Sequence, residues 1–264
     1  SAAVYLSGNA TNVTIQGNHI TANGDYGLLS VTSSTVSGLT VDGNVFDGQT
    51  FSGPTPGGNG FATQFTTANV PRQIVALGGG NGGGNFTTVS FTNNTVGGTA
   101  GGSNGGGEQG NTLVTIDAHD VNISDNSFAG TTTRYATLLR ARGTDTTITG
   151  NSFDGSNLGQ NAGVIEYNSS IFTGVSGGAP ADLAAMMAAN TFANRAVWSS
   201  EAAARNASDY VIGVSVSNAL AGAQNGDTIN VGAGTYAETL NITKAVDIEG
   251  AGVGQTIIQP NALL

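Results

Sequence analysis

The chain of 264 residues has no cysteine, only 5 prolines, 6% aromatic residues and 9% charged residues. The lack of cysteine excludes a disulfide scaffold, and the scarcity of proline and charge argues against intrinsic disorder. Lys and Arg together number 7 against 17 Asp and Glu, a net charge of −10, so the basic clusters that nucleic acids need are lacking. No apolar run approaches the roughly 18 residues that span a bilayer. We therefore expect neither nucleic-acid binding nor membrane insertion.

The chain is instead rich in small and polar residues, with 42 Gly, 33 Thr and 27 Asn. These residues are weak helix formers, so a helical bundle is excluded. The glycines show no three-residue period, which excludes collagen.

An internal repeat organises this composition. The pattern apolar-x-apolar-x-(Gly/Asn/Asp)-Asn-x-apolar recurs, with small variations, at 13–20, 39–46, 89–96, 121–128 and 146–153. Alternation of apolar and polar residues indicates a β-strand with one buried face. The residue pair ending in Asn indicates a corner, because Gly and Asn tolerate left-handed backbone angles.

A second strand is expected before each corner motif, at 27–31, 73–77, 112–116, 136–140 and 163–167, the last with no clear Asn motif after it. Such short strands bury a face only by stacking in parallel, about 4.8 Å apart. Stacking predicts a ladder of corner amides that bond to one another. Its members would be Asn18, Asn44, Asn94, Asn126 and Asn151. The alternative is that these asparagines are only surface turn residues.

These repeats resemble the pectin-lyase-like right-handed parallel β-helix superfamily. Residues 219–231, 234–238, 242–250 and 256–258 are similar to the N-terminal cap, with its short amphipathic helix, and to the first coil of such proteins, although here the cap follows the coils. The resemblance implies an all-β, right-handed parallel β-helix with a short helical segment and a cap-like C-terminal segment. We expect coils over 1–178 with glycine-rich loops at 78–84 and 99–107. A helical linker would follow over 179–208, with a covering helix at 180–189. The segment 209–264 would then form a cap and the first coil of the same or a next β-helix.

The permuted order suggests a function. An open β-helix end exposes unpaired strand edges, so 209–264 is expected to cover Val4, Tyr5 and Leu6, in its own chain or in a neighbouring copy. Ile257 and Ile258 would belong to the same contact. Contact between copies would be head to tail. We expect a self-assembling structural module of an extracellular bacterial surface protein, such as a fibre, surface layer or adhesin, and no enzyme.

The alternative is a lyase, an epimerase or a sugar-binding module that acts on acidic polysaccharide. The sequence from Asp117 to Asp120 is similar to the Asp-Pro-His-Asp motif of alginate C5-epimerases, with Ala in place of Pro. The resemblance would make Asp117, His119 and Asp120 catalytic, and Arg140, one coil away, could face a sugar carboxylate. A simple polar turn is the competing interpretation of these residues, and His19 is expected at the surface.

No cofactor is expected, although calcium is possible. Asp42, Asp47 and Asp125 are weak calcium candidates near turns, together with Asp117, Asp120 and Asp154. Solvated turn carboxylates are the alternative, because the repeated Gly-Gly-x-Gly-x-Asp calcium motif is absent.

Overall fold

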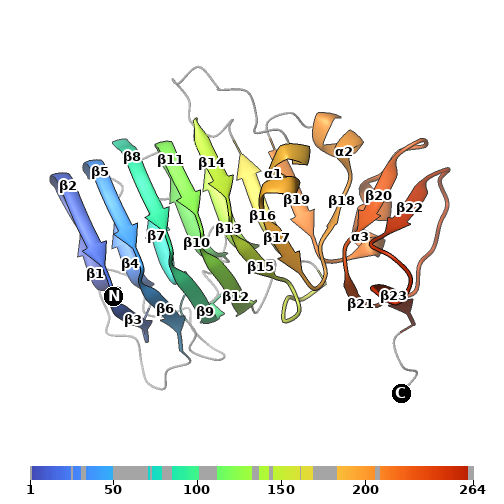
Figure 1. Ribbon diagram of the computed structural model, residues 1–264, viewed down its shortest axis with the longest axis horizontal. Coiled ribbons are helices and arrows are strands. Elements are labelled where there is room, and N and C mark those ends of the chain that lie inside the picture. Colours follow the sequence, from blue (N-terminus) through green and yellow to red (C-terminus); the bar gives the residue numbers. More distant parts are fainter. Residues whose placement is uncertain are drawn as a thin grey trace, which may run out of the picture.

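The computed structural model describes residues 2–24, 26–30, 34–49, 71, 73–78, 85–100, 112–132, 137–142, 145–160, 162–168, 183–205 and 209–260. Most of the two predicted glycine-rich loops and the first residues of the predicted helix lie outside these ranges. The protein is all-β with long parallel sheets (Figure 1). Within the described ranges, no helix is long and apolar enough to cross a membrane.

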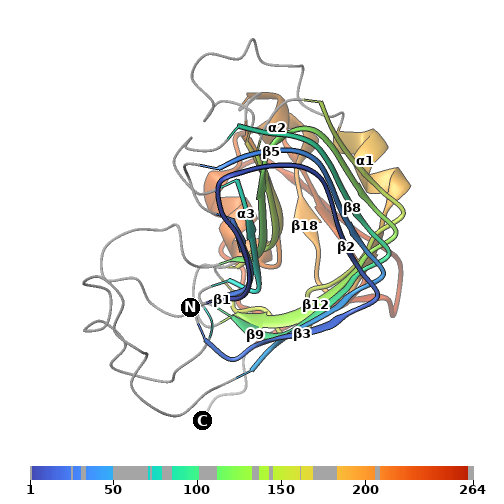
Figure 2. The same cartoon turned by 90° about the vertical axis from the view of Figure 1, so that its left-hand side faces the viewer.

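The chain repeatedly passes through three sheets, and we call each pass a coil. Looking along the molecule, the strands of successive coils lie over one another (Figure 2). The first five coils consist of β1 (Ala2–Leu6), β2 (Asn9–Gln16) and β3 (His19–Ala22); β4 (Tyr26–Ser30), β5 (Thr35–Asp42) and β6 (Val45–Gly48); β7 (Val75–Leu77), β8 (Asn85–Thr92) and β9 (Thr95–Ala100); β10 (Thr112–Asp117), β11 (His119–Ser124) and β12 (Ser127–Thr132); β13 (Thr137–Arg142), β14 (Thr146–Thr149) and β15 (Ser152–Asp154). Every pairing between these strands is parallel.

A helix replaces the middle strand in the sixth coil. This coil consists of β16 (Gly163–Asn168), α1 (Leu183–Ala189) and β17 (Thr191–Ala193). Met186 of α1 is buried in the core, and the carbonyl of Ala189 accepts a 2.7 Å bond from the backbone N–H of Gly150, beside β14. The helix therefore lies over the last strand of the five-stranded sheet, β14, while the ten-stranded sheet continues beyond it.

The corner after each middle strand follows the sequence motif. The residue before the corner asparagine has a left-handed backbone in the first five coils, as at Asn93 (φ 54°) and Asp125 (φ 58°). The asparagine side chains bond to one another from coil to coil. Asn190, which was not among the predicted ladder residues, extends the ladder to the sixth coil: its Oδ1 accepts from Asn151 Nδ2 at 2.9 Å.

Side chains two residues beyond the corner asparagine point inward, as the pattern predicts. In the last three coils these residues are phenylalanines, and their rings stack with centroids 4.9 Å apart between Phe128 and Phe153 and 5.4 Å apart between Phe153 and Phe192. Burial of such rings contributes apolar area and favourable ring contacts at once. The core thus runs as a continuous column inside the coils.

The C-terminal part changes strand direction. It consists of β18 (Val197–Trp198), α2 (Ser200–Arg205), β19 (Asp209–Gly213), α3 (Val216–Gly222), β20 (Thr228–Val231), β21 (Gly234–Ala237), β22 (Asp247–Gly250) and β23 (Thr256–Gln259). β19 pairs antiparallel with β16, and β18 lies antiparallel between β19 and β20. β22 pairs in parallel with β20, so β22 runs opposite to β1 in one ten-stranded sheet.

This arrangement corrects two expectations. The segment 179–208 is more than a helical linker, because β17 and β18 within it join the sheets. The segment from 209 onward does not cover Val4–Leu6 of its own chain, since it attaches to β16 and lies at the opposite end of the molecule from β1 (Figure 1). A small second core forms there around Ile229, Val231 and Tyr236.

Candidate functional site

The N-terminal end of the stack leaves core-facing side chains uncovered. β1, β2 and β3 are the outermost strands of their three sheets. Val4, Leu6, Val13 and Ile15 point toward the core but are only half-buried. The residues that pair with them in the second coil are at most 1% exposed: Leu28, Ser30, Leu39 and Val41. The difference arises because no described strand lies on the outer side of the first coil.

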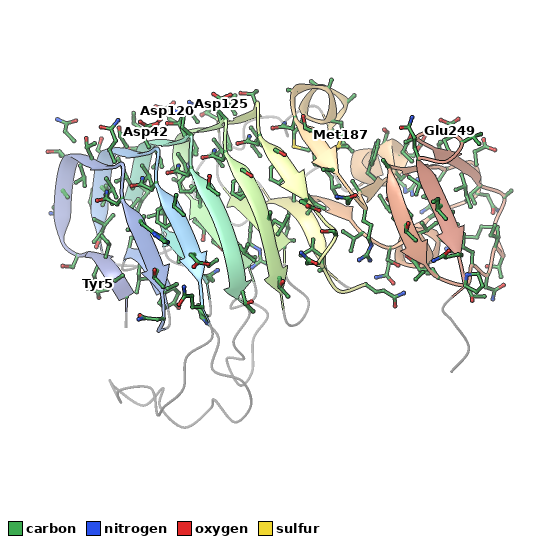
Figure 3. All side chains as sticks on the ribbon, turned by 60° about the horizontal axis from the view of Figure 1, so that its bottom comes forward. Tyr5, Asp42, Asp120, Asp125, Met187 and Glu249 are labelled. Atoms are coloured by element: carbon green, nitrogen blue, oxygen red, sulfur yellow. The ribbon has the colours of Figure 1, made fainter. Side chains whose placement is uncertain are left out.

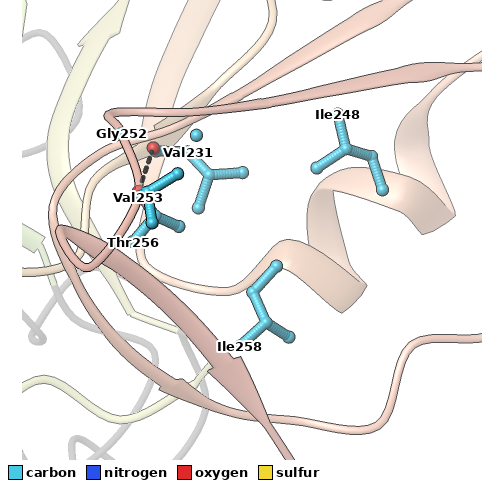
Figure 4. Close-up of a pocket in the computed structure, with 7 residues that line it drawn as sticks. Val231, Ile248, Gly252, Val253, Thr256 and Ile258 are labelled. Carbon is cyan, nitrogen blue, oxygen red and sulfur yellow. Dashed lines mark hydrogen bonds between the residues drawn. The ribbon is translucent and has the colours of Figure 1, made fainter.

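The C-terminal end is open in the same way. β22 and β23 are outermost in their sheets, and Ile258 of β23 is 39% exposed although its partner Tyr236 is fully buried. Val253, in the turn between the two strands, is fully exposed. Figure 4 shows the resulting depression of about 430 Å³, which is lined by Val231, Ile248, Gly250, Gly252, Val253, Thr256 and Ile258.

The five residues predicted for assembly lie at these two opposite ends. Val4 and Leu6 face the core at one end, and Ile258 does so at the other. Tyr5, 55% exposed, points outward, and so does Ile257, which pairs with the exposed Thr235.

Four further uncovered residues were not among those predicted: Val13, Ile15, Ile248 and Val253. The first two could have been found from the sequence, because they occupy the apolar positions of the first corner motif in the chain.

Within the C-terminal part, an ion pair holds the turn before β20 to α2. The Asp227 carboxylate accepts two bonds from the Arg205 guanidinium, at 2.8 and 2.6 Å, and one from the backbone N–H of Gln224 at 2.8 Å. These bonds, those from Arg205 above all, lower the pKa of Asp227 to about 2. Gly226, just before it, has φ 93°, so the Gly-Asp pair of the cap-like motif provides a turn and an anchor.

Acid is expected to loosen this anchor. The Asp227 pKa is lowered on folding, so the contribution of the pair is complete above the unfolded value near 3.9 and is lost as the pH falls toward 2. We expect Asp227→Asn to remove that part of the pH dependence. Fluorescence of Trp198, the single tryptophan, would report unfolding between pH 2 and 5. Asp247→Asn on β22 is the control, and equal pH profiles for all three proteins would contradict the assignment.

A second buried carboxylate caps helix α3. Glu238, 4% exposed, accepts bonds from Ser215 Oγ at 2.9 Å and from the backbone N–H groups of Val216 and Ser217 at 3.2 and 2.8 Å. Burial raises the pKa of Glu238, but the bonds from Ser217, Ser215 and Val216 outweigh it and leave the pKa lowered. Glu238 thus stays charged where it satisfies otherwise unpaired amides.

The predicted catalytic residues differ in their surroundings. Asp117 ends β10 and is 1% exposed, whereas His119 begins β11 and is half-buried, paired in register with Thr87. Asp120 is exposed, has φ 54° and accepts a bond from Thr88 Oγ1 at 3.0 Å. One of the two carboxylates is thus inside the protein and the other is at its surface.

The fourth predicted catalytic residue already has a partner in its own chain. Arg140, 7% exposed on β13, donates to the Glu166 carboxylate of β16 at 2.7 Å. These two residues pair in register in adjacent strands. An arginine that neutralised a sugar carboxylate would have to exchange this contact.

The calcium candidates are engaged by neighbouring donors. Asp42 accepts bonds from Asn93, Thr92 and Gln16 at 2.8, 2.7 and 2.8 Å, and these bonds lower its pKa, with the Asn93 bond first in size. Asp47 accepts from Gln49 at 2.9 Å.

The other candidates are likewise spread out. Asp154 accepts from Ser156 and Asn194, and Asp125 lies along the same long face as Asp42 and Asp120 (Figure 3). Among the described residues, no three or more acidic or histidine side chains gather closely enough to hold a metal ion. Calcium binding therefore stays a prediction without a site.

Comparisons of the chain with models of protein families, with curated proteins and with solved structures found no match in any of the three.

Proposed function

We propose that the chain is a structural module of an extracellular surface protein that assembles end to end. We further propose that its stacked sheets form a right-handed parallel β-helix of the pectin-lyase-like kind. The handedness is supported by the path of the chain, which turns clockwise from β1 through β2 to β3 as it recedes from the viewer (Figure 2). The superfamily is supported by the corner motif and the cap-like motif of the sequence.

The observation that carries the assembly proposal is the uncovered core at both ends. Val4, Leu6 and Val13 at one end, and Ile248 and Ile258 at the other, face the core without a further coil over them. Uncovered strand edges and contiguous apolar surface are both typical of interaction sites. Two different open ends on one long molecule favour a head-to-tail contact that does not close.

Strand direction defines the contact further. When the sheet continues from one copy into the next, β22 of the first meets β1 of the second in antiparallel orientation. Such pairing is feasible, because β19 already pairs antiparallel with the parallel stack at β16. The proposed contact of β22 with β1 between copies would therefore have the same antiparallel geometry as the contact of β16 with β19 within the chain.

Two charge variants test the proposal. We expect Val13→Lys at one end, or Ile258→Lys at the other, to raise the dissociation constant for self-association at least tenfold, because an ammonium would become buried without a partner. Light scattering over a concentration series would measure it. The control is Asn122→Lys, which places the same charge on the exposed middle of β11.

Mixing the two variants tests the polarity. Each variant keeps one intact end, and the two intact ends differ, so the mixture should form dimers and nothing longer. A monomeric wild-type mass at the highest concentrations would refute assembly, whereas filaments from Ile258→Lys alone would refute the head-to-tail arrangement.

Binding of a polysaccharide is the second candidate. A shallow depression of about 280 Å³ crosses the outer face of β5, β8, β11 and β14, and its lining includes Thr40, Ser90, Asp120, Asp145 and Thr147. Hydroxyls and carboxylates in a row can bond to sugar hydroxyls. Retention on an immobilised polysaccharide that Asp120→Ala abolishes would favour this function, and turnover of a uronate polymer lost in His119→Ala would favour an enzyme.

A further inference from the structure

The hydrogen bonds of the asparagine ladder have a direction. Each Oδ1 accepts two bonds, one from the backbone N–H and one from Nδ2 of the asparagine in the coil before it, at 2.8–3.1 Å. The accepting residues are Asn44, Asn94, Asn126, Asn151 and Asn190. The ladder thus binds every coil to the one that precedes it.

A second set of bonds reinforces this direction. The same five asparagines donate from Nδ2 to a main-chain carbonyl in the preceding coil, at 2.8–2.9 Å. The accepting carbonyls belong to Ile15, Val41, Phe91, Ile123 and Ile148. Each coil therefore satisfies two donors and one acceptor of the coil that precedes it.

The pattern stops at Asn18. Its Oδ1 accepts no bond from any residue that the structure describes, and its Nδ2 reaches only Asn44 Oδ1 and its own strand at Gln16 O. Asn18 is exposed, whereas Asn44, one coil on, is 1% exposed. The ladder consequently ends with an acceptor that elsewhere takes two donors.

We propose that the N-terminal end is a strand-addition site for a parallel coil that carries asparagine at its corner. The partner would add one strand to β1, β2 and β3, cover Val4 and Val13 with its core-facing side chains, and donate twice to Asn18 Oδ1. Asparagine fits because its backbone N–H and its amide reach one oxygen together. Aspartate has no amide to donate, and serine has a single hydroxyl donor.

A second copy of this chain does not supply that chemistry at its C-terminal end. The connection between β22 and β23, Ala251–Gln255, contains no asparagine, and β22 approaches β1 in the antiparallel direction. The proposed head-to-tail contact buries apolar surface but leaves Asn18 Oδ1 without its pair of donors. A coil of the repeat sequence therefore satisfies Asn18 Oδ1 where the head-to-tail contact does not, and the two partners would compete for the free edge of β1.

A peptide of residues 35–48 is the probe, because it contains β5, the Gly43–Asn44 corner and β6. Fluorescence anisotropy of the labelled peptide would give its dissociation constant from the intact chain. We expect the peptide with Asn44→Ala to bind about tenfold more weakly, since the amide donor to Asn18 Oδ1 is lost and only the backbone N–H remains. In the protein variant Asn18→Ala, which keeps the coil but lacks the acceptor, both peptides should bind equally.

Register is tested by crosslinking in this cysteine-free chain. Thr14 pairs with Thr40 in the parallel stack, so by analogy Thr14→Cys should form a disulfide with a peptide that carries Thr40→Cys. Thr235→Cys, exposed at the other end, is the control and should not react.

Equal affinity of the two peptides for the wild-type protein, or no saturable binding, would overturn the proposal. If self-association persisted after such a result, the strand-addition site would be refuted but the proposed end-to-end assembly would not. If the peptide bound but the protein did not self-associate, the end-to-end assembly would be refuted and the strand-addition site would be supported.

Discussion

Replacing Asn126 by alanine is expected to lower the free energy of unfolding by about 4 kcal/mol, the largest effect we predict for a single polar side chain. Asn126 accepts from the backbone N–H and from Nδ2 of Asn94, and it donates to Phe91 O and Asn151 Oδ1. All of these groups are buried, so the substitution removes four buried hydrogen bonds, each of which contributes about 0.5–1.5 kcal/mol. Asn94 Nδ2 keeps its bond to Val41 O, and Asn151 Oδ1 keeps the backbone N–H of residue 126, whereas the backbone N–H of Asn94 loses its partner. Urea unfolding followed by circular dichroism would measure the loss.

Asn122 is a matched control for Asn126. It lies on β11, four residues earlier, but it is exposed and its amide makes only a long bond of 3.4 Å to Ser124. Asn122→Ala should change stability by no more than about 0.5 kcal/mol. If the two variants were equally stable, the ladder would contribute no more than surface turn residues do.

Replacing Glu238 by alanine is expected to destabilise the C-terminal part by about 2–4 kcal/mol. The substitution leaves the N–H groups of Val216 and Ser217 and the hydroxyl of Ser215 without their carboxylate at the start of α3. Bonds to a charged group contribute about 1.5–3 kcal/mol each when the partners are buried, although the losses at one site do not add fully. Amide hydrogen exchange at Ser217, together with Trp198 fluorescence, would measure the effect locally.

The pH dependence gives a further check on Glu238. Its pKa is lowered on folding, so its contribution is present above the unfolded value near 4.3 and is lost as the pH falls below that value. Glu238→Gln, which keeps the shape and one acceptor, should lie between the wild type and alanine and lack this dependence. Glu249→Ala, on the exposed edge strand β22, is the control. Unchanged exchange at Ser217 in Glu238→Ala would show that the carboxylate does not hold the helix.

Much of the stack could be predicted because each coil repeats the same physical requirement. An apolar side chain must point inward every second residue, and the corner needs a residue that accepts a left-handed backbone, as Asn93 and Asp125 do. Five copies made those requirements visible in the sequence. The asparagine spacing of 25 to 50 residues was tolerated because extra residues between strands leave the ladder bonds unchanged.

The sixth coil was harder to recognise because its middle element lacks the alternation of apolar and polar residues that marks a strand. Its middle element is α1, so the alternation that marks the other coils is missing before Asn190. The sequence Asn190-Thr191-Phe192 does match the end of the motif, and this was the available signal. A corner motif is therefore more reliable than the strand pattern ahead of it.

The junction with the C-terminal part could not be read from the pattern. Parallel and antiparallel strands place apolar residues alike, so the reversal between β16 and β19 leaves no trace in the alternation. The cap-like motif indicated a local turn and strand but not the surface on which they pack. The sequence also did not show that Arg140 is buried beside Glu166, because alternation of apolar and polar residues does not tell what lies over the outer face of a strand.

The ten-stranded sheet sets a length. Neighbouring strands lie about 4.8 Å apart, so the ten strands of one sheet, together with the spacing that joins them to the next copy, measure roughly 48 Å along the long axis of the molecule. In a filament built head to tail, this value becomes the axial repeat of the subunit, and the strand spacing divides it into ten equal layers. Fibre diffraction from such a filament would then carry both periods, and its meridional pattern would report how many strands each subunit contributes.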